Sequence, residues 1–370
     1  MLLIWFARSI CMVICCATIL AFKASISGSS IHHSSVGHRA TRPLFSRIDQ
    51  YDCYNDDNKR VVITGGTLGI GWCLAREFLL RGDSVLICSR TSARVEAALQ
   101  ALRPYVAADA VLNGIVADVA EPTDVENLAV QVQKSLGGVD HWVNAAGSVT
   151  QNAPLINVQP NDIITCTRAN LIGPLLCSRI AIQIMLEQQT GKKFTDGSNL
   201  SVTNTYSTLP DKSLHIWNFG FGNFGRSLSR SAATHKSTKA GLSALTEVLK
   251  AEVKPYPAIA VHQCSPGVVL TDLLLNSLPT GENSIAAKNV FNALAIDPDS
   301  AARQLCEKMR SADGSDAAVE LLTPVDALTK LVSEVPNIIL KRGGQHFDAE
   351  GNRVKRSGVE YKANGAMKLY

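Results

Sequence analysis

From residue 60 onward, short runs of apolar residues alternate with longer segments in which apolar residues recur at helical spacing. The apolar runs predict strands over Arg60–Thr64, Ser84–Ser89, Val111–Ala117, His141–Asn144, Leu214–Phe219, Ala258–Ser265 and Ala317–Leu322. The other segments predict helices over Ile70–Leu80, Ser92–Leu102, Pro122–Leu136, Asn161–Gln189, Ala232–Glu252 and Ser300–Ser311. This alternation is typical of a parallel sheet covered by helices on both faces. The pattern therefore predicts an α/β fold with a doubly wound parallel sheet of about seven strands in a single domain.

The same pattern sets the predicted limits of this domain. We expect it to span residues 58–335, with a polar inserted loop over 191–213 that is rich in Thr, Ser, Asn and Asp. Residues 336–370 form a C-terminal extension, and the glycines after Leu340 favour an extended or lightly packed arm.

Residues 1–57 have the character of a targeting leader. An apolar block with one charge, Arg8, fills residues 1–21 and is short for a membrane span, which favours a signal peptide. Residues 22–57 begin as a basic, Ser-rich segment without an acid before Asp49, as in a transit peptide. The two together resemble a bipartite plastid leader, with Phe22 directly behind Ala21, and they predict a chloroplast location. An N-terminal membrane anchor on the mature protein is the alternative for the apolar block.

Composition and charge narrow the classes of partner. The chain has 370 residues, 46% of them apolar and 18% charged, and a formal net charge of +4. Its basic residues are scattered, so we expect no nucleic-acid partner. Three of the ten cysteines, Cys11, Cys15 and Cys16, lie in the apolar block 1–21. The rest show neither a Cys-x-x-Cys pair nor histidine at ligand spacing, so no metal site or disulfide framework is indicated. Cys88, within an apolar strand pattern, is expected to be a small core residue.

A glycine-rich turn directly follows the first predicted strand and opens a helix. It reads Thr64-Gly65-Gly66-Thr67-Leu68-Gly69-Ile70-Gly71. Gly65 permits a tight turn, Gly69 allows backbone amides to approach a pyrophosphate, and Gly71 allows the helix to pack closely on the sheet. The phosphates would lie at the positive end of the helix dipole. The turn therefore predicts a Rossmann-type site for a dinucleotide coenzyme.

The end of the second strand indicates which coenzyme is bound. An NAD enzyme places an acidic residue there for the ribose hydroxyls, but this chain has Ser89-Arg90. Because the Arg90 guanidinium would pair with a 2′-phosphate that a carboxylate would repel, the sequence predicts NADP(H).

The ends of later strands supply the remaining predicted coenzyme contacts. Asp118 and Val119 are expected at the adenine edge, and Thr271 at the nicotinamide amide. The other expected positions are Asn144, Ala145, Ala146 and Gly147 on the adenosine side, and the turn Pro266, Gly267 and Val268 after the sixth strand.

The markers Thr-Gly-x-x-x-Gly-x-Gly, Asn-Ala-Ala-Gly, a helical Asn170 and a Ser-Pro-Gly turn resemble the short-chain dehydrogenase/reductases from about Lys59 to Leu331. Within that superfamily the chain is similar to chlorophyll(ide) b reductase, the non-yellow-coloring family. This resemblance rests on Ala75–Leu80, Ser265–Leu275, Leu321–Pro324 and the tail Phe347–Gly351. It implies NADPH-dependent reduction of the formyl group of chlorophyll b or chlorophyllide b in plastids, as part of chlorophyll catabolism.

The resemblance also implies catalytic positions, and two of them are altered. Lys239, in Ser-Thr-Lys-Ala-Gly, matches the lysine of the superfamily, and Asn170 matches its helical asparagine. The tyrosine four residues before the lysine is His235, and the usual serine position falls at Phe221, Gly222 or Asn223. Since the Lys239 charge would push the pKa of a histidine below about 6.5, a neutral His235 would be a weaker proton donor than tyrosine.

Two hypotheses of different class therefore stay open. In the first, the protein is a working reductase in which His235 replaces tyrosine, assisted by Asn223, Ser227, Ser229 or Tyr206 of the inserted loop. In the second, it is a non-catalytic NADP(H)-binding relative with a binding or regulatory role. His235 could also be an ordinary exposed or core histidine.

The substrate and partners are less defined by the sequence. A planar pigment would require a broad apolar cleft, and candidates to line it are Phe219, Phe221, Phe224, Leu273, Leu274 and Leu275. Association with a plastid or thylakoid membrane stays open, although we identify no second hydrophobic span. A homo-oligomer would pair through the predicted helices Asn161–Gln189 and Ala232–Glu252, as related folds do.

Overall fold

A computed structural model describes residues 58–150, 153–190, 213–221, 233–278, 282–312, 318–339 and 342–370. The leader and nearly all of the 191–213 loop lie outside these residues, so the predictions made for them stay predictions. Contacts divide the chain into two units, Met1–Pro43 and Leu44–Tyr370, and every described residue belongs to the second.

The described residues form a seven-stranded parallel sheet with strand order β3-β2-β1-β4-β5-β6-β9. The strands are β1 Arg60–Thr64, β2 Ser84–Ser89, β3 Leu112–Val116, β4 His141–Asn144, β5 Leu214–Phe219, β6 Ile259–Ser265 and β9 Val319–Glu320. The central strands are nearly continuous buried runs, because helices cover both of their faces. The predicted α/β doubly wound fold is confirmed. The last strand is shorter than the predicted Ala317–Leu322.

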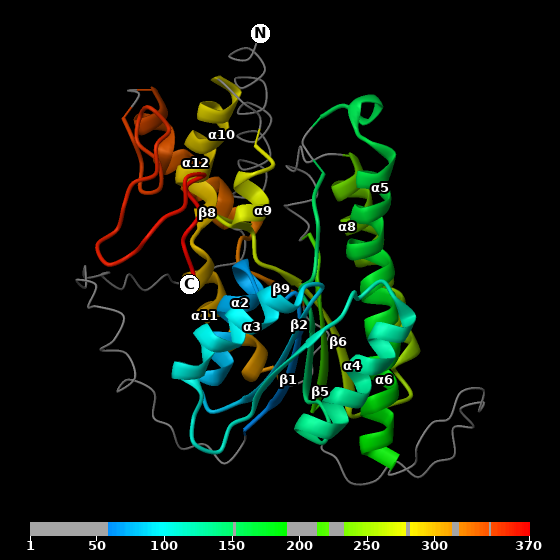
Figure 1. The fold of residues 1–370 in the computed structure, drawn as a ribbon. Helices are drawn as coiled ribbons and strands as arrows, with labels where there is room; N and C mark the ends of the chain where they lie inside the picture. The colour runs from blue at the N-terminus through cyan, green and yellow to red at the C-terminus, as the bar shows by residue number, and fades with distance from the viewer. Residues whose placement is uncertain are drawn as a thin grey trace, which may run out of the picture. The chain divides into compact units, whose positions relative to one another are not determined.

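Helices cover the sheet in two layers (Figure 1). One layer contains α2 Gly69–Leu79, α3 Ser92–Leu102 and α11 Pro298–Arg310. The other contains α4 Pro122–Leu136, α5 Pro160–Thr167, α6 Gly173–Thr190 and α8 Ala233–Glu252. Each layer encloses its own apolar core, and alternate residues of a strand serve the two cores: Val61 and Ile63 face α2, whereas Val62 faces α4 and α6. Cys88 is fully buried, as predicted.

The predicted helix Asn161–Gln189 is present but changes its winding. Five residues, Arg168–Ile172, form a π-helical turn between α5 and α6. Short π turns inside α-helices occur often at functional sites, and this one contains the fully buried Asn170. By length and composition Pro160–Thr190 could cross a membrane, but half of its most apolar window is buried inside the protein. That is the behaviour of a core helix, so it is weak support for a membrane span.

Three histidines, one each on β4, β5 and β6, pack around a tryptophan. His141, His215 and His262 surround Trp217, and neighbouring ring centroids lie 4.1–6.2 Å apart. His215 Nδ1 and His262 Nε2 share a hydrogen bond of 3.0 Å, and Trp217 Nε1 donates to His141 Nδ1 at 3.1 Å. All four side chains are buried. Burial lowers the pKa of His215 to about 3 and holds that of His141 well below its ordinary value, so these two rings are neutral at physiological pH.

The chain after β6 holds structure that the sequence did not predict. A small two-stranded sheet joins β7 Val268–Val269 to β8 Ala295–Ile296. The additional helices are α9 Asp272–Leu275, α10 Glu282–Leu294 and α12 Pro324–Ile339. Helix α12 crosses the predicted domain boundary at position 335.

The C-terminal segment 342–370 forms two antiparallel bridges, Phe347 to Arg353 and Tyr361 to Met367. Phe347 and Ala366 are each 1% exposed and pack in a small core with Leu270. Most residues of this segment are exposed or half-buried, and it has neither a helix nor an extended strand, but it contributes two apolar side chains to this small core.

Candidate coenzyme and active site

The glycine turn has the geometry that a close approach of backbones requires. Gly65 and Gly69 adopt positive φ angles of 67° and 54°, a region that L side chains rarely occupy. A Cβ on Gly65 would lie 2.7 Å from Ala146 Cα, and a Cβ on Gly71 would lie 2.4 Å from the carbonyl oxygen of Gly65. No side chain fits at either position. The turn therefore holds β1, α2 and the loop after β4 at backbone distance.

The start of α2 is suited to an anionic group. Leu68 occupies the N-cap position, supplies no side-chain hydrogen bond, and no acidic residue lies in the first turn. An uncapped helix N-terminus with glycines in its first turn presents backbone N–H groups to a phosphate. Thr67 is buried and its carbonyl accepts a 2.6 Å hydrogen bond from the hydroxyl of Tyr370. The Tyr370 ring packs against Trp72 of α2, so the C-terminal segment braces the turn from outside.

Two arginines stand free at the end of β2. Arg90 follows the half-buried Ser89 and is exposed, and Arg94 is exposed in the first turn of α3. Neither makes an ion pair with any residue in the described part of the chain. Burial raises the pKa of the Tyr370 phenol, and the positive charge of the nearby Arg94 opposes that rise. The sequence reasoning found Arg90 but missed Arg94, which lies about one helical turn further on.

The ends of β3 and β4 support the site by holding its backbone. Asp118 accepts a hydrogen bond from the backbone N–H of Ala120, which orders the turn after β3. Val119 is buried, and its side chain packs against Gly173. Asn144 bonds to Trp142, Ser178 and Asn218 in the core. Its polar atoms are therefore occupied within the protein.

The loop after β4 is clamped by Asn170. Asn170 Oδ1 accepts from the backbone N–H of Ser148 at 2.8 Å, and Nδ2 donates to the Ser148 carbonyl at 2.8 Å and to Thr238 Oγ1 at 3.1 Å. A Cβ on Gly147 would lie 3.2 Å from Asn170 Oδ1 and 3.9 Å from Lys239 Nζ. Gly147, Asn170 and Lys239, predicted from three separate motifs, thus meet at one place.

Lys239 points from α8 toward the carboxyl end of β5. Its Nζ donates a 2.6 Å hydrogen bond to the carbonyl of Phe219. Burial lowers the pKa of Lys239 to about 8. The side chain is therefore mostly charged at neutral pH, and it loses its proton as the pH rises through about 8.

The turn after β6 brings the last predicted positions to the glycine turn. Gly267, between Pro266 and Val268, has a φ of 74°. Val268 begins β7, and Thr271 precedes α9. A Cβ on Gly69 would lie 3.3 Å from the Thr271 methyl group. Thr271, which is predicted to contact the nicotinamide amide, therefore lies directly beside the glycine turn.

Comparison with known proteins agrees with this geometry. The short chain dehydrogenase family model matches residues 59–204. Chlorophyll(ide) b reductase NOL, chloroplastic, of Arabidopsis thaliana is 35% identical over 283 residues, which cover 74% of this chain and 73% of that protein. The chain belongs to the short-chain dehydrogenase/reductase superfamily.

Other members of the superfamily extend the comparison. A probable chlorophyll(ide) b reductase of Arabidopsis thaliana is 33% identical over 330 residues, covering 85% of this chain, which spans only 60% of that protein's length. Among solved structures, an actinorhodin polyketide ketoreductase variant with NADPH has a TM-score of 0.57 and 21% identity, over 72% of this chain and 97% of that one. That likeness shows the fold. Members of this superfamily typically use a nicotinamide dinucleotide.

His235, the residue at the position where the sequence resemblance predicts tyrosine, has surroundings that differ from those of a free imidazole. It is half-buried, with its ring edge-on to Phe221 at 5.3 Å. Its Nδ1 is buried and finds no hydrogen-bond partner among the described residues. Burial, followed by the Lys239 charge, lowers the pKa of His235 to about 4. The imidazole is therefore neutral at physiological pH.

The usual serine position has no hydroxyl in the described part of β5 and its following loop. Gly220 and Phe221 are described there, whereas Gly222, Asn223, Ser227 and Ser229 lie outside the described residues, as does Tyr206. Hydroxyls do gather nearby, on a set that the sequence reasoning missed. Thr150 and Thr234 share a 2.6 Å hydrogen bond, and Thr238 bonds to Asn170.

The residues proposed for an apolar cleft separate into two groups. Phe219 and Leu275 are buried in the main core and the small C-terminal core respectively. Phe221 and Leu274 are half-buried, and Leu273 is 45% exposed on α9. Only the second group can contact a ligand without rearrangement, and Phe224 lies outside the described residues.

Proposed function

We propose that this protein is an NADP(H)-dependent reductase of the formyl group of chlorophyll b, chlorophyllide b or a related pigment, acting in chlorophyll catabolism. The observation that carries the proposal is the meeting of Gly147, Asn170 and Lys239 beside the glycine turn, in a chain 35% identical to a chlorophyll(ide) b reductase over 73% of its length. The chloroplast location belongs to this proposal, and its support is that both plant relatives are chloroplastic by name.

The residues present fit an NADP(H) coenzyme. The uncapped start of α2 would receive the pyrophosphate, where Gly65 and Gly71 leave no space for a side chain. Arg90 and Arg94 are exposed cations without an ion-pair partner among the described residues, and they would hold the extra phosphate of the 2′ position. Lys239 would hold the nicotinamide ribose hydroxyls. The coenzyme supplies the hydride.

The chain's own residues then orient and polarise the carbonyl. Neutral His235 would donate a ring N–H to the carbonyl oxygen. The support for this role is that its Nδ1 has no hydrogen-bond partner among the described residues. Charged Lys239 would stabilise the negative charge that develops on that oxygen. Asn170 holds the Ser148 backbone, which keeps the loop after β4 in place beside Lys239.

A second candidate function is favoured by one observation. The pKa of His235 is lowered to about 4, so the imidazolium form, which could transfer a full proton, is scarce at neutral pH. Loss of general acid catalysis costs about 10²–10⁴ in rate. An NADP(H)-binding relative without turnover would keep the coenzyme contacts, because none of them depends on tyrosine.

The decisive experiment follows NADPH oxidation on addition of chlorophyllide b to the leaderless protein and to its His235→Tyr variant. A working reductase gives measurable turnover in the parent and a rise of about 10²–10⁴-fold in the variant, since tyrosine next to a charged lysine is the better acid. Lys250→Gln, which changes an α8 residue whose Nζ pairs with Glu247, serves as the matched control and should leave the rate unchanged.

The outcomes separate the two candidates. Turnover in neither protein, together with a thermal shift on adding NADPH, would establish the binding relative and end the reductase proposal. The pigment as small-molecule partner, membrane association and a homo-oligomer formed through α6 and α8 remain proposals, and exposed Leu175 and Val248 on these helices support the last one.

A further inference from the structure

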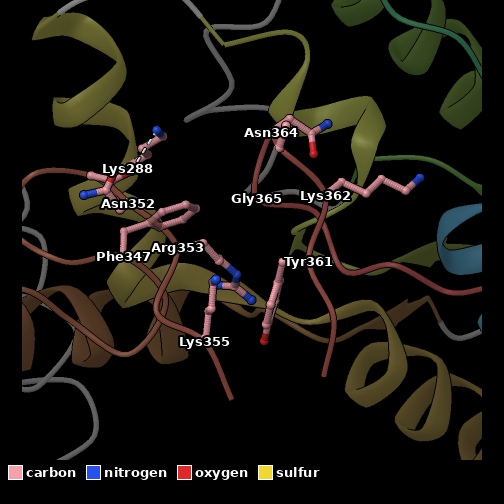
Figure 2. Close-up of a pocket in the computed structure, with 11 residues that line it drawn as sticks. Lys288, Phe347, Asn352, Arg353, Lys355, Tyr361, Lys362, Asn364 and Gly365 are labelled. Atoms are coloured by element: carbon pink, nitrogen blue, oxygen red, sulfur yellow. Dashed lines mark hydrogen bonds between the residues drawn. The ribbon is translucent and has the colours of Figure 1, made fainter. Parts of the chain in front are cut away.

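The C-terminal segment and α10 line an open pocket of about 380 Å³, and none of the coenzyme residues lines it. That volume lies in the range of small-molecule sites. Figure 2 shows the pocket between the two turns of the segment and α10. The lining residues are Lys288, Phe347, Gly351, Asn352, Arg353, Lys355, Tyr361, Lys362, Ala363, Asn364 and Gly365.

All the charged side chains that line this pocket are positive. Four cations line it and no carboxylate does. Arg353 forms an ion pair with Asp297, and Lys362 forms one with Asp272. Neither aspartate lines the pocket. Lys288 and Lys355 form no ion pair with any described residue, and Lys288 Nζ donates only to the carbonyl of Gly351, at 2.8 Å. The pocket therefore carries about two uncompensated positive charges, which favour an anionic ligand.

The wall of the pocket is pre-organised. The Arg353 guanidinium lies between the rings of Phe347, at 5.4 Å, and Tyr361, at 4.9 Å, and its side chain is 6% exposed (Figure 2). Nη1 donates to the carbonyl of His346, whereas the buried Nε has no partner among the described residues. Stacking and hydrogen bonding fix this cation before any ligand arrives, which lowers the entropic cost of binding.

One wall of the pocket is bonded to the helix beside the coenzyme turn. Lys362 Nζ pairs with Asp272 at 2.6 Å, and Asn364 Nδ2 donates to Asp272 at 3.0 Å and to Asn276 at 2.7 Å. Asp272 directly follows Thr271, which borders Gly69. A ligand long enough to pass over α9 could therefore reach both the pocket and the nicotinamide region.

We propose that the Lys288–Lys355 pocket binds the propionate carboxylate of the pigment, an assignment that rests on the proposed function. In chlorophyllide b the formyl group and the free propionate lie on diagonally opposite rings of a rigid macrocycle. An anchor for the carboxylate must accordingly be separated from the site of hydride transfer, as this pocket is. Chlorophyll carries a phytyl ester in place of the carboxylate, so the pocket selects chlorophyllide over chlorophyll.

The test compares chlorophyllide b with its propionate methyl ester, in the parent and in a Lys288→Gln/Lys355→Gln double variant. Glutamine keeps an N–H donor for the Gly351 carbonyl. In the parent, KM should be about tenfold lower for the acid than for the ester, and the variant should raise KM for the acid about tenfold, because a charge-assisted hydrogen bond contributes at least that factor. KM for the ester and kcat should not change. Lys134→Gln, an exposed lysine of α4, is the control.

Pigment binding, followed by the shift of its absorption spectrum, separates this inference from the proposed function. If neither pigment is turned over but the acid binds more tightly than the ester in a lysine-dependent manner, the pocket assignment stands and the reductase fails. Equal affinities for acid and ester in the parent, or no binding of either, overturn the pocket assignment. A third result would also overturn it. If millimolar inorganic phosphate stabilises the parent but not the double variant, and the acid and the ester bind equally well, the pocket is a phosphate site.

Discussion

The two halves of the sheet are stabilised by different kinds of residue. In β1 and β2 the buried side chains are apolar apart from Thr64, and the adjoining turn depends on glycines. In β4, β5 and β6 the core also contains polar side chains, which are His141, Asn144, His215, Asn218, His262, Gln263 and Ser265. In the proposed function, the first half would position the coenzyme through its backbone. The second would position reacting groups through side-chain networks.

This difference explains which features of the superfamily survive in this chain. A backbone-built site tolerates most side-chain changes, provided that the glycines remain. A site built from side chains changes its chemistry when one residue changes, as at His235. Coenzyme binding should therefore be the more robust of the two properties, and four experiments test the contrast.

Acid should destabilise the half that contains the histidines. The pKa of His215 is lowered to about 3 and that of His141 is also low, so below pH 6.5 the unfolded chain binds protons that the folded chain excludes. Each histidine then removes about 1.4 kcal/mol of stability per pH unit. From pH 6.5 to 5 we expect a loss of about 3 kcal/mol in urea unfolding, because the unfolded histidines are only half protonated at the upper limit. His215→Gln should remove about half of this pH dependence, and a flat profile in the parent would refute the explanation.

Gly71→Ala should break the coenzyme half. The added Cβ would meet the Gly65 carbonyl at 2.4 Å, and because that atom is backbone the clash is relieved only by moving the turn. We expect a loss of about 2–4 kcal/mol in unfolding free energy, together with loss of NADPH binding. Gly137→Ala is the control, because Gly137 has a φ of 68° but nothing within 4 Å of the new Cβ. Its cost should be about 1 kcal/mol, from backbone strain alone. Equal costs at both positions would contradict the close approach.

Arg90→Asp tests the choice of coenzyme. Losing a charge-assisted contact should raise the Kd for NADPH by about 10–100-fold and change the Kd for NADH less than about threefold. Arg103→Asp, at the far end of α3, is the matched control. Parallel losses for both coenzymes would mean that Arg90 does not lie beside the extra phosphate.

Tyr370→Phe should have the smallest effect. It removes the 2.6 Å hydrogen bond to the Thr67 carbonyl while keeping the ring against Trp72. The expected loss is about 0.5–1.5 kcal/mol in unfolding free energy, with a weaker affinity for NADPH. Tyr105→Phe, at the other side of Trp72, should change neither. If the two variants behave alike, the C-terminal segment does not brace the turn.

Sequence reasoning succeeded where local pattern determines structure. The predicted bounds of β1, β2, β4 and β5 equal the observed ones, because each strand is a short apolar run between polar residues. It missed α10 and α12, although Ala327 and Leu331 lie at helical spacing and Thr323 bonds to Asp326 at the start of α12. Pro336 inside that helix obscured the pattern.

The candidate site was predicted where its residues belong to motifs, as Gly147, Asn170 and Lys239 do. Arg94, Thr150 and Tyr370 belong to no motif, and only the tertiary fold brings them to the site. The lowered pKa of Lys239 could not be predicted either, since it depends on burial that sequence does not specify.

The π turn at Arg168–Ile172 sets the rotational phase of the long helix. In an α-helix each residue advances the face by about 100°. The wide turn lets Cys166 and Asn170 face Ser148 and Thr238, while Cys177, Ala181 and Met185 downstream face the core. If these five residues wound as an ideal α-helix, the downstream row would rotate by about 100°, the advance of one residue, and would leave the core. The irregular turn therefore allows one long helix both to contact the candidate site and to pack in the core.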